Sequence, residues 1–113
     1  MSGITTHVLD VSRGRPASGI PVTLEVELEG NWKLLGKGTT NEDGRLADLL
    51  DPDAAITAGA YRLTFDTAEY FAEHAMRSFY PQISVIFKIK DPDQHYHVPL
   101  LLSPFGYSTY RGS

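Results

Sequence analysis

The chain has 113 residues, of which 42% are hydrophobic and 21% charged, a composition typical of a folded domain and not of a disordered segment. Its formal net charge is −4 and its Lys and Arg residues form no cluster, so nucleic acid and anionic membranes are poor candidate partners. The lack of cysteine excludes a disulfide scaffold and a thiol nucleophile. We therefore expect a single domain over residues 1–113.

The beginning of the sequence is informative about the cellular location of the protein. The first ten residues, MSGITTHVLD, lack the basic and then apolar segments of a secretory signal. No apolar run approaches the length needed to cross a membrane. We therefore expect a cytoplasmic protein that has no membrane partner.

Apolar and polar residues alternate along most of the chain, which is the period of a strand with one buried face. The pattern begins in residues 4–10 and is clearest in residues 21–30, PVTLEVELEG, where Val and Leu alternate with Thr and Glu. It continues in residues 32–40, 60–66 and 83–90. Turn-forming sequences such as RGRPASG, NEDGR and DPDQ separate these runs.

Residues 67–76, TAEYFAEHAM, have helical character, with Thr67 as the N-cap and Pro81 as the residue that stops the helix. Many short strands with one helix predict an all-β sandwich, although the pattern leaves the order of the strands open. The aromatic side chains taken as core or packing residues are those of Trp32, Tyr70, Phe71 and Phe79.

The last apolar run, residues 95–102, has the sequence HYHVPLLL and also reads as a strand. Alternation places Tyr96 and the aliphatic residues after it on the core face, and His95, His97, Pro99 and Leu101 on the other face. Because Pro and Leu share this outer face with the histidines, we expect a ligand cleft or a subunit interface to cover it.

His7 lies in the same way on the non-core face of the first strand, so His7 and His97 share one site if the two strands are neighbours. Any single histidine is most often a surface or interface residue. The spacing of His95 and His97 also suits a metal site with His7 as a third ligand. Acid–base catalysis is equally compatible, because imidazole titrates near pH ~6.5. The spacing alone does not separate these alternatives.

Arg45 directly follows an Asp-Gly turn. An arginine at such a position is usually a solvated surface charge. Its functional use would be as a planar, permanently charged group that binds an oxyanion or a carboxylate. By itself Arg45 does not decide between these roles.

The two ends of the chain carry the motifs of a known family. Residues 4–22, ITTHVLDVSRGRPASGIPV, and residues 95–104, HYHVPLLLSP, resemble the transthyretin-like proteins that act as 5-hydroxyisourate hydrolases. The ending YRGS, residues 110–113, is the most specific element, since hormone-carrying transthyretins share the fold but not this ending. The resemblance extends over nearly the whole chain.

The resemblance implies a fold and an assembly. The fold is a transthyretin-like β-sandwich of two four-stranded sheets with one short helix, and the assembly is a homotetramer, a dimer of dimers. Its active sites would lie in the central channel, which agrees with the half-apolar face that carries His7 and His97. In this fold the strand of residues 95–102 lies inside its sheet. Proline has no N–H for the hydrogen bonds between strands, so the pairing around Pro99 is left open.

The resemblance also assigns the site residues. Matched motif by motif, the catalytic residues are His7, Arg45, His97 and Ser113, and the residues expected to bind substrate are Tyr110, Arg111 and Gly112. His95 belongs to the same motif and is expected at most to orient these residues without contacting the substrate itself. The resemblance implies neither a metal ion nor an organic cofactor.

The implied reaction is the hydrolytic opening of 5-hydroxyisourate, a product of urate oxidation, to 2-oxo-4-hydroxy-4-carboxy-5-ureidoimidazoline. His7 and His97 would activate water, and Arg45 would hold the small-molecule substrate and stabilise negative charge. Ser113 would orient the water or a histidine through its hydroxyl or a terminal carboxylate. The alternative is a small-ligand carrier of the transthyretin type, with an open, apolar channel. A metal-dependent hydrolase and a plain interaction domain are weaker alternatives.

Overall fold

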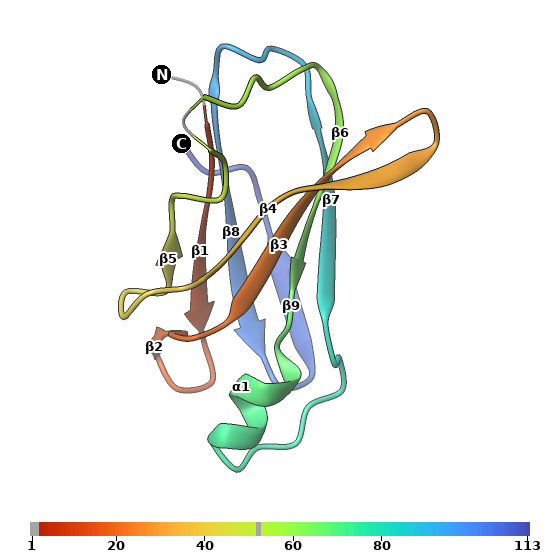
Figure 1. Cartoon of the computed structure of the whole chain (residues 1–113). Coiled ribbons are helices and arrows are strands. Elements are labelled where there is room, and N and C mark those ends of the chain that lie inside the picture. The colour runs from red at the N-terminus through yellow and green to blue at the C-terminus, as the bar shows by residue number, and fades with distance from the viewer. Residues whose placement is uncertain (1–2, 52) are drawn as a thin grey trace.

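Two β-sheets face each other in the computed structural model, which describes residues 3–51 and 53–113 (Figure 1). The first sheet contains the strands β1 (Gly3–Asp10), β8 (His95–Ser103) and β9 (Gly106–Thr109), and the two-residue strands β2 (Arg15–Pro16) and β5 (Arg45–Leu46). The second contains, in order, β4 (Asn31–Thr39), β3 (Pro21–Leu28), β6 (Gly59–Phe65) and β7 (Ile83–Ile89). The helix α1 (Ala68–Glu73) lies at one end of the sandwich.

The predicted all-β sandwich with one short helix is confirmed. In the described residues the first sheet has five strands and not four, because β2 and β5 are separate short pieces. Both pair with β1, β2 at Leu9 and Asp10 and β5 at Thr6 and His7. They follow one another along the edge of β1 that faces away from β8, so the sheet is no wider than predicted.

The strands β1 and β8 are joined in parallel, whereas the other strand pairs of the described residues are antiparallel. The register runs without a shift from Gly3 opposite His95 to Asp10 opposite Leu102. A buried hydrogen bond supports it, in which the Thr6 hydroxyl donates to the Val98 carbonyl at 2.6 Å. The adjacency on which a shared histidine site depends is therefore present.

The alternating residues of both sheets form the core, as the sequence predicts. Fully buried side chains include Val8 of β1, Leu24 of β3, Leu63 of β6 and Leu100 of β8. Phe79 is not part of this core, because its side chain is 69% exposed. It lies in the connection after α1, where its N–H donates to the Pro104 carbonyl and its ring remains outside, against Tyr80.

The helix is shorter than the sequence predicts. It ends at Glu73, well before Pro81, because Ala75 adopts a left-handed backbone conformation with φ of 54°. The Met76 N–H donates to the Phe71 carbonyl, which is the hydrogen bond of a Schellman motif. Thr67 precedes the helix as predicted, but its hydroxyl donates to the Tyr80 carbonyl instead of capping. Among the described residues, no helix has the length and apolar character that crossing a membrane requires.

A buried polar contact attaches the helix to the end of β1. Tyr70 donates a 2.6 Å hydrogen bond to Asp10, which is fully buried and also accepts hydrogen bonds from Ser12 and the Arg13 N–H. Burial alone would raise the pKa of Asp10, but the hydrogen bonds from Ser12 and Tyr70 lower it below its ordinary value. Burial and the Asp10 carboxylate raise the pKa of Tyr70 to about 12. The contact therefore consists of an ionised carboxylate and a protonated phenol.

This contact predicts the effect of Tyr70→Phe. The substitution keeps the buried ring but removes one donor from an ionised, buried acceptor, which costs about 1.5–3 kcal/mol of unfolding free energy. Urea denaturation followed by circular dichroism measures the loss. Tyr107→Phe is the matched control, since Tyr107 is 43% exposed, and it should change stability by less than about 0.5 kcal/mol. Equal stabilities of the two variants would contradict the role given to this hydrogen bond.

Candidate active site

The outer face of the first sheet carries most of the predicted site residues in two neighbouring rows. In one row, the register places Arg45 of β5 opposite His7 of β1, and His7 opposite Pro99 of β8. In the next row, Thr5 of β1 lies opposite His97 of β8. Residues that are directly opposite in a sheet point to the same face, so these side chains share one surface.

The C-terminal segment adds one further member to each row. The ladder between β8 and β9 stops at Leu100 opposite Thr109 and resumes in the same register at His97 opposite Gly112. Pro99 falls in the gap, opposite Tyr110, where its missing N–H interrupts the pairing. The Thr109 hydroxyl donates to the Pro99 carbonyl at 2.7 Å, so that carbonyl still has a partner.

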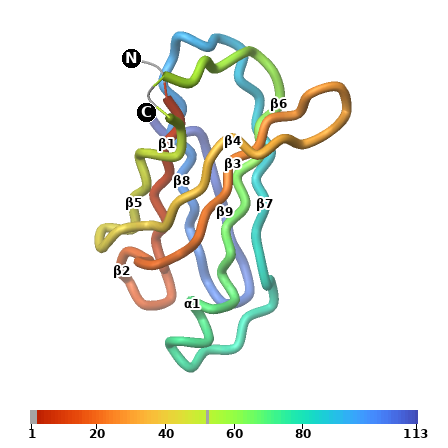
Figure 2. The backbone as a smooth tube through the Cα atoms, in the orientation of Figure 1, coloured from red at the N-terminus to blue at the C-terminus, as the bar shows by residue number. Residues whose placement is uncertain are grey.

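The resumed pairing brings the end of the chain onto β8, beside the start of β1 (Figure 2). The Gly112 N–H donates to the His97 carbonyl at 2.8 Å. A side chain at position 112 would not fit, because its Cβ would lie 2.7 Å from His97 Cδ2 and 3.2 Å from Pro99 Cγ. Glycine is therefore required here so that the His97 ring can lie against the C-terminal segment.

These rows surround a shallow pocket of 260 Å³. Three of the predicted catalytic residues line it, namely Arg45, His97 and Ser113. The remaining lining residues are Thr5, Thr6, Leu46, Ala47 and His95. The structure thus brings together residues that are far apart in the sequence.

His7 belongs to the adjacent row and does not line the pocket. Its Nε2 lies 2.9 Å from the Asp43 carbonyl. A carbonyl only accepts hydrogen bonds, so Nε2 carries the proton and donates, which leaves the lone pair of His7 on Nδ1. The turn that precedes β5 therefore fixes both the position and the tautomer of His7.

His97 is the part-buried histidine of the pocket. Burial lowers the pKa of His97, and electrostatic interactions with Arg45, His7 and His95 lower it further, against a smaller opposing effect of a hydrogen bond with the Thr5 backbone. His97 is therefore neutral at pH 7 and can accept a proton there. This is the protonation state that a general base requires.

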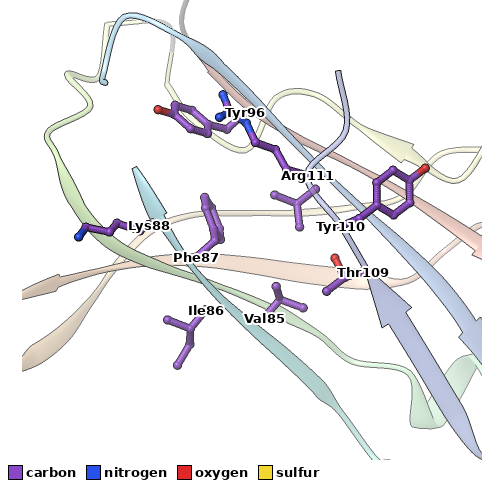
Figure 3. A pocket seen from close by; sticks show the side chains of 9 residues that line it. Val85, Ile86, Phe87, Lys88, Tyr96, Thr109, Tyr110 and Arg111 are labelled. Atoms are coloured by element: carbon purple, nitrogen blue, oxygen red, sulfur yellow. The ribbon is translucent and has the colours of Figure 1, made fainter. Parts of the chain in front are cut away.

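Arg111 is directed away from the pocket, although the resemblance assigns it to substrate binding. Its guanidinium lies 4.5 Å above the Tyr96 ring and donates to the Gln94 side-chain oxygen at 2.8 Å. Figure 3 shows this side of the segment, where Arg111 lines a second pocket, of 280 Å³, together with Phe87 of β7. The Tyr110 ring points in the opposite direction and is 57% exposed. Arg111 contacts the core side of β8, and Tyr110 also lines this second pocket and does not line the pocket of the histidines.

Thr5 was missed by the reasoning from sequence. Alternation places it on the same face as His7, but only the register with β8 shows that it lies beside His97. Its hydroxyl is 2.8 Å from His97 Nδ1 and 3.0 Å from His95 Nε2. His95, which was expected at most to support the site, is thereby connected to His97.

The donor groups on this face are not arranged for a metal. Within residues 3–51 and 53–113, no group of three or more His, Cys, Asp or Glu side chains could hold a metal ion. The three-histidine metal site considered from the sequence therefore has no geometric basis in the described residues. What the pocket does hold is a neutral imidazole, a guanidinium and hydroxyl groups.

Comparisons with known proteins give a consistent relationship. The family model described as the HIUase/Transthyretin family matches residues 4–112. A 5-hydroxyisourate hydrolase of Mus musculus is 48% identical over 115 residues, which cover 99% of this chain and 96% of the mouse protein. The structure of Klebsiella pneumoniae 5-hydroxyisourate hydrolase is similar with a TM-score of 0.85 and 40% identity, and all of both chains is covered.

Transthyretin from Sparus aurata is similar as well. Its structure has a TM-score of 0.90 and 29% identity, with 99% of this chain and 97% of that chain covered. The transthyretin is closer in shape and the hydrolase is closer in sequence. Overall shape therefore does not separate the two branches, and the residues of the site have to do so.

The electrostatics of the pocket predict the effect of Arg45→Gln. Removing the guanidinium favours the protonated form of His97, so the pKa of His97 should rise toward the ordinary value for histidine. A titration of the histidine ring protons by NMR measures the change. Arg15→Gln on β2 is the control, because Arg15 is not among the charges that act on His97. An unchanged pKa of His97 in Arg45→Gln would show that the guanidinium does not act on the ring.

Proposed function

The chain belongs to the HIUase/transthyretin family, and we propose that it hydrolyses 5-hydroxyisourate in the breakdown of urate. The observation that carries the proposal is the pocket itself, where a neutral, part-buried His97 lies beside Arg45 and Ser113. Hydrolysis of a cyclic amide needs a base for water, a group that stabilises negative charge and a proton for the departing nitrogen. These residues can supply each of them.

In the proposed reaction, Nε2 of His97 accepts a proton from water while the water oxygen bonds to the ring carbonyl carbon. Negative charge develops on the carbonyl oxygen, and the Arg45 guanidinium stabilises it. When the carbon–nitrogen bond breaks, the proton on Nε2 passes to the departing nitrogen. The products are a carboxylic acid, which ionises in water, and an opened ring.

His7 and Ser113 have supporting parts in this proposal. The Nδ1 lone pair of His7 is a second acceptor on the same face, and Ser113 lines the pocket where the attacking water would lie. Tyr110, which the register places opposite Pro99, would limit the site on the side of the C-terminal segment. No step requires a metal or an organic cofactor, and we propose a cofactor-independent hydrolase.

The carrier function is the second candidate, favoured by the similarity to a transthyretin. A site for an apolar ligand would be lined by apolar side chains. The pocket instead contains His95, His97 and Arg45, three groups that interact with water or with charge. The hydrolase therefore explains these residues, and the carrier leaves them without a role.

An ultraviolet assay tests the proposed activity, with 5-hydroxyisourate generated by urate oxidase and its decay followed in the presence of EDTA. We expect the chain to accelerate the decay and His97→Asn to lower the rate by roughly 100- to 10,000-fold, the usual effect of removing a general base. His74→Asn, at the end of α1, removes a histidine outside the pocket and should keep full activity.

Any of three results would contradict a part of this proposal. A chain without any effect on the decay would overturn the hydrolase, and a His97→Asn variant with full activity would overturn the base. Loss of activity in EDTA that returns on addition of a metal ion would overturn the cofactor-independent reaction. Cytoplasmic location remains a prediction from the sequence.

We also propose that four copies assemble as a dimer of dimers. The outer face of the first sheet supports this, because Leu9 and Leu101 lie directly opposite each other there and are half-buried within one chain. The strands β7 and β9 are each the last strand of a sheet, so they present unpaired backbone groups to a second copy. Such a face and such edges are suited to contacts between copies.

The assembly predicts the effect of Leu101→Glu. A charge on the outer face cannot be buried without a partner, so the tetramer of 12.5 kDa chains should dissociate to dimers or monomers. Light scattering after size-exclusion chromatography measures the mass. Leu28→Glu is the control, because Leu28 ends β3 on the second sheet and is 47% exposed. A wild-type chain that elutes as a monomer would contradict the assembly.

A further inference from the structure

The Thr5 hydroxyl lies between two imidazole rings. It is 2.8 Å from Nδ1 of His97, the residue opposite it in the parallel register, and 3.0 Å from Nε2 of His95. His95 and His97 are two residues apart on β8, so both rings project from the same face of the sheet. One hydroxyl of β1 therefore connects two histidines of β8.

A hydroxyl has a single proton, which couples the two rings. If His97 Nδ1 carries its proton and donates to Thr5 Oγ1, the Thr5 hydroxyl donates to the lone pair of His95 Nε2. In the reverse arrangement, His95 donates and His97 Nδ1 accepts. Thr5 thus allows two tautomers of His97, and they differ in whether Nε2 is free or protonated.

The surroundings of His97 favour the first arrangement. The Nδ1 edge of the ring faces Thr5, and the Cδ2 edge lies against Gly112. Nε2 of His97 has no hydrogen-bond partner in residues 3–51 and 53–113, whereas Nδ1 has one. A free Nε2 lone pair is what a ring at the side of the pocket would use to accept a proton.

We propose that Thr5 is a positioning residue, which holds His97 with its proton on Nδ1 and its lone pair on Nε2, and that it relays positive charge from His97 to His95. The part of His97 in catalysis rests on the function proposed above. The tautomer that Thr5 imposes does not rest on it, because it can be observed without substrate.

The relay moves one positive charge by shifting two protons, one along each of the two existing hydrogen bonds. When Nε2 of His97 accepts a proton, Nδ1 passes its proton to Thr5 Oγ1, and the Thr5 hydroxyl passes its own proton to His95 Nε2. His97 is then neutral and His95 is an imidazolium. The reverse movement restores Nδ1–H when Nε2 gives its proton to the departing nitrogen, so no proton is gained or lost.

The difference in exposure of the two rings gives the relay its direction. Within one chain His95 is exposed and His97 is part-buried, so an imidazolium is better solvated at His95 than at His97. Arg45 on β5 and His7 on β1 face His97 from the neighbouring strands, and the interactions of both oppose an imidazolium at His97. Charge moved to His95 therefore lies nearer to solvent.

The test compares Thr5→Val with Thr5→Ser in the full chain. Valine keeps the branched shape that a strand prefers but has no hydroxyl, and serine keeps the hydroxyl and is the matched control. The first measurement is the tautomer of His97 by 15N NMR of the histidine rings without substrate. We expect Nδ1–H in the wild type and in Thr5→Ser, and a shift toward Nε2–H in Thr5→Val.

The second measurement is the rate in the 5-hydroxyisourate assay. Thr5→Val should lower kcat with little change in KM, by roughly the 10- to 100-fold that loss of the outer hydrogen-bond partner costs a metal-bound histidine, taken here as an analogy. Thr5→Ser should restore kcat. His95→Gln keeps an acceptor for the Thr5 hydroxyl but cannot carry the charge, so it should keep the His97 tautomer and still lower kcat.

Each result either supports or overturns a part of the proposal. An Nε2–H tautomer of His97 in the wild type, or the same tautomer in Thr5→Val, would overturn the positioning role whatever the activity is. Full kcat in His95→Gln would overturn the relay. A wild type with the expected tautomer and no hydrolysis would overturn the proposed function while leaving the role of Thr5 in holding His97 intact.

Discussion

The parallel pairing of β1 with β8 is the contact on which the site depends. It joins residues about 90 positions apart, such as Thr5 and His97, which local sequence preferences cannot bring together. Core residues on the inner face of both strands and the buried hydrogen bond of Thr6 hold the register in place. A slip by one residue would turn His97 toward the core and remove the pocket, so the stability of the core and the geometry of the site are one constraint.

Two residues shape the other side of the pocket through the groups that they lack. Pro99 has no N–H, so the ladder to the C-terminal segment opens at Tyr110, and Gly112 has no Cβ, so the ladder closes again against the His97 ring. Arg111 lies between them and is held on the opposite face by the Tyr96 ring and Gln94. The ending YRGS is thus a structural element in which only some members face the histidines.

The sequence allowed the faces of the strands to be predicted because alternation is a local property with a period of two. It did not allow the end of α1 to be predicted, since that end depends on the left-handed conformation of Ala75 rather than on Pro81. The role of Thr5 could not be predicted from the sequence either. A threonine on an outer face is unremarkable until the register puts two imidazoles beside it, and register depends on contacts distant in the chain.

The electrostatics of the pocket connect these features to its chemistry. In Ser-His-Asp sites a carboxylate orients the base and stabilises its imidazolium. Here the partner of His97 Nδ1 is the neutral Thr5 hydroxyl, and no Asp or Glu is among the residues that line the pocket. A neutral partner fixes the ring without adding a negative charge that would hold a proton on it, while Arg45 and His7 disfavour that proton. A base of this kind releases the proton readily, and a reaction that must return it to a departing nitrogen needs that property.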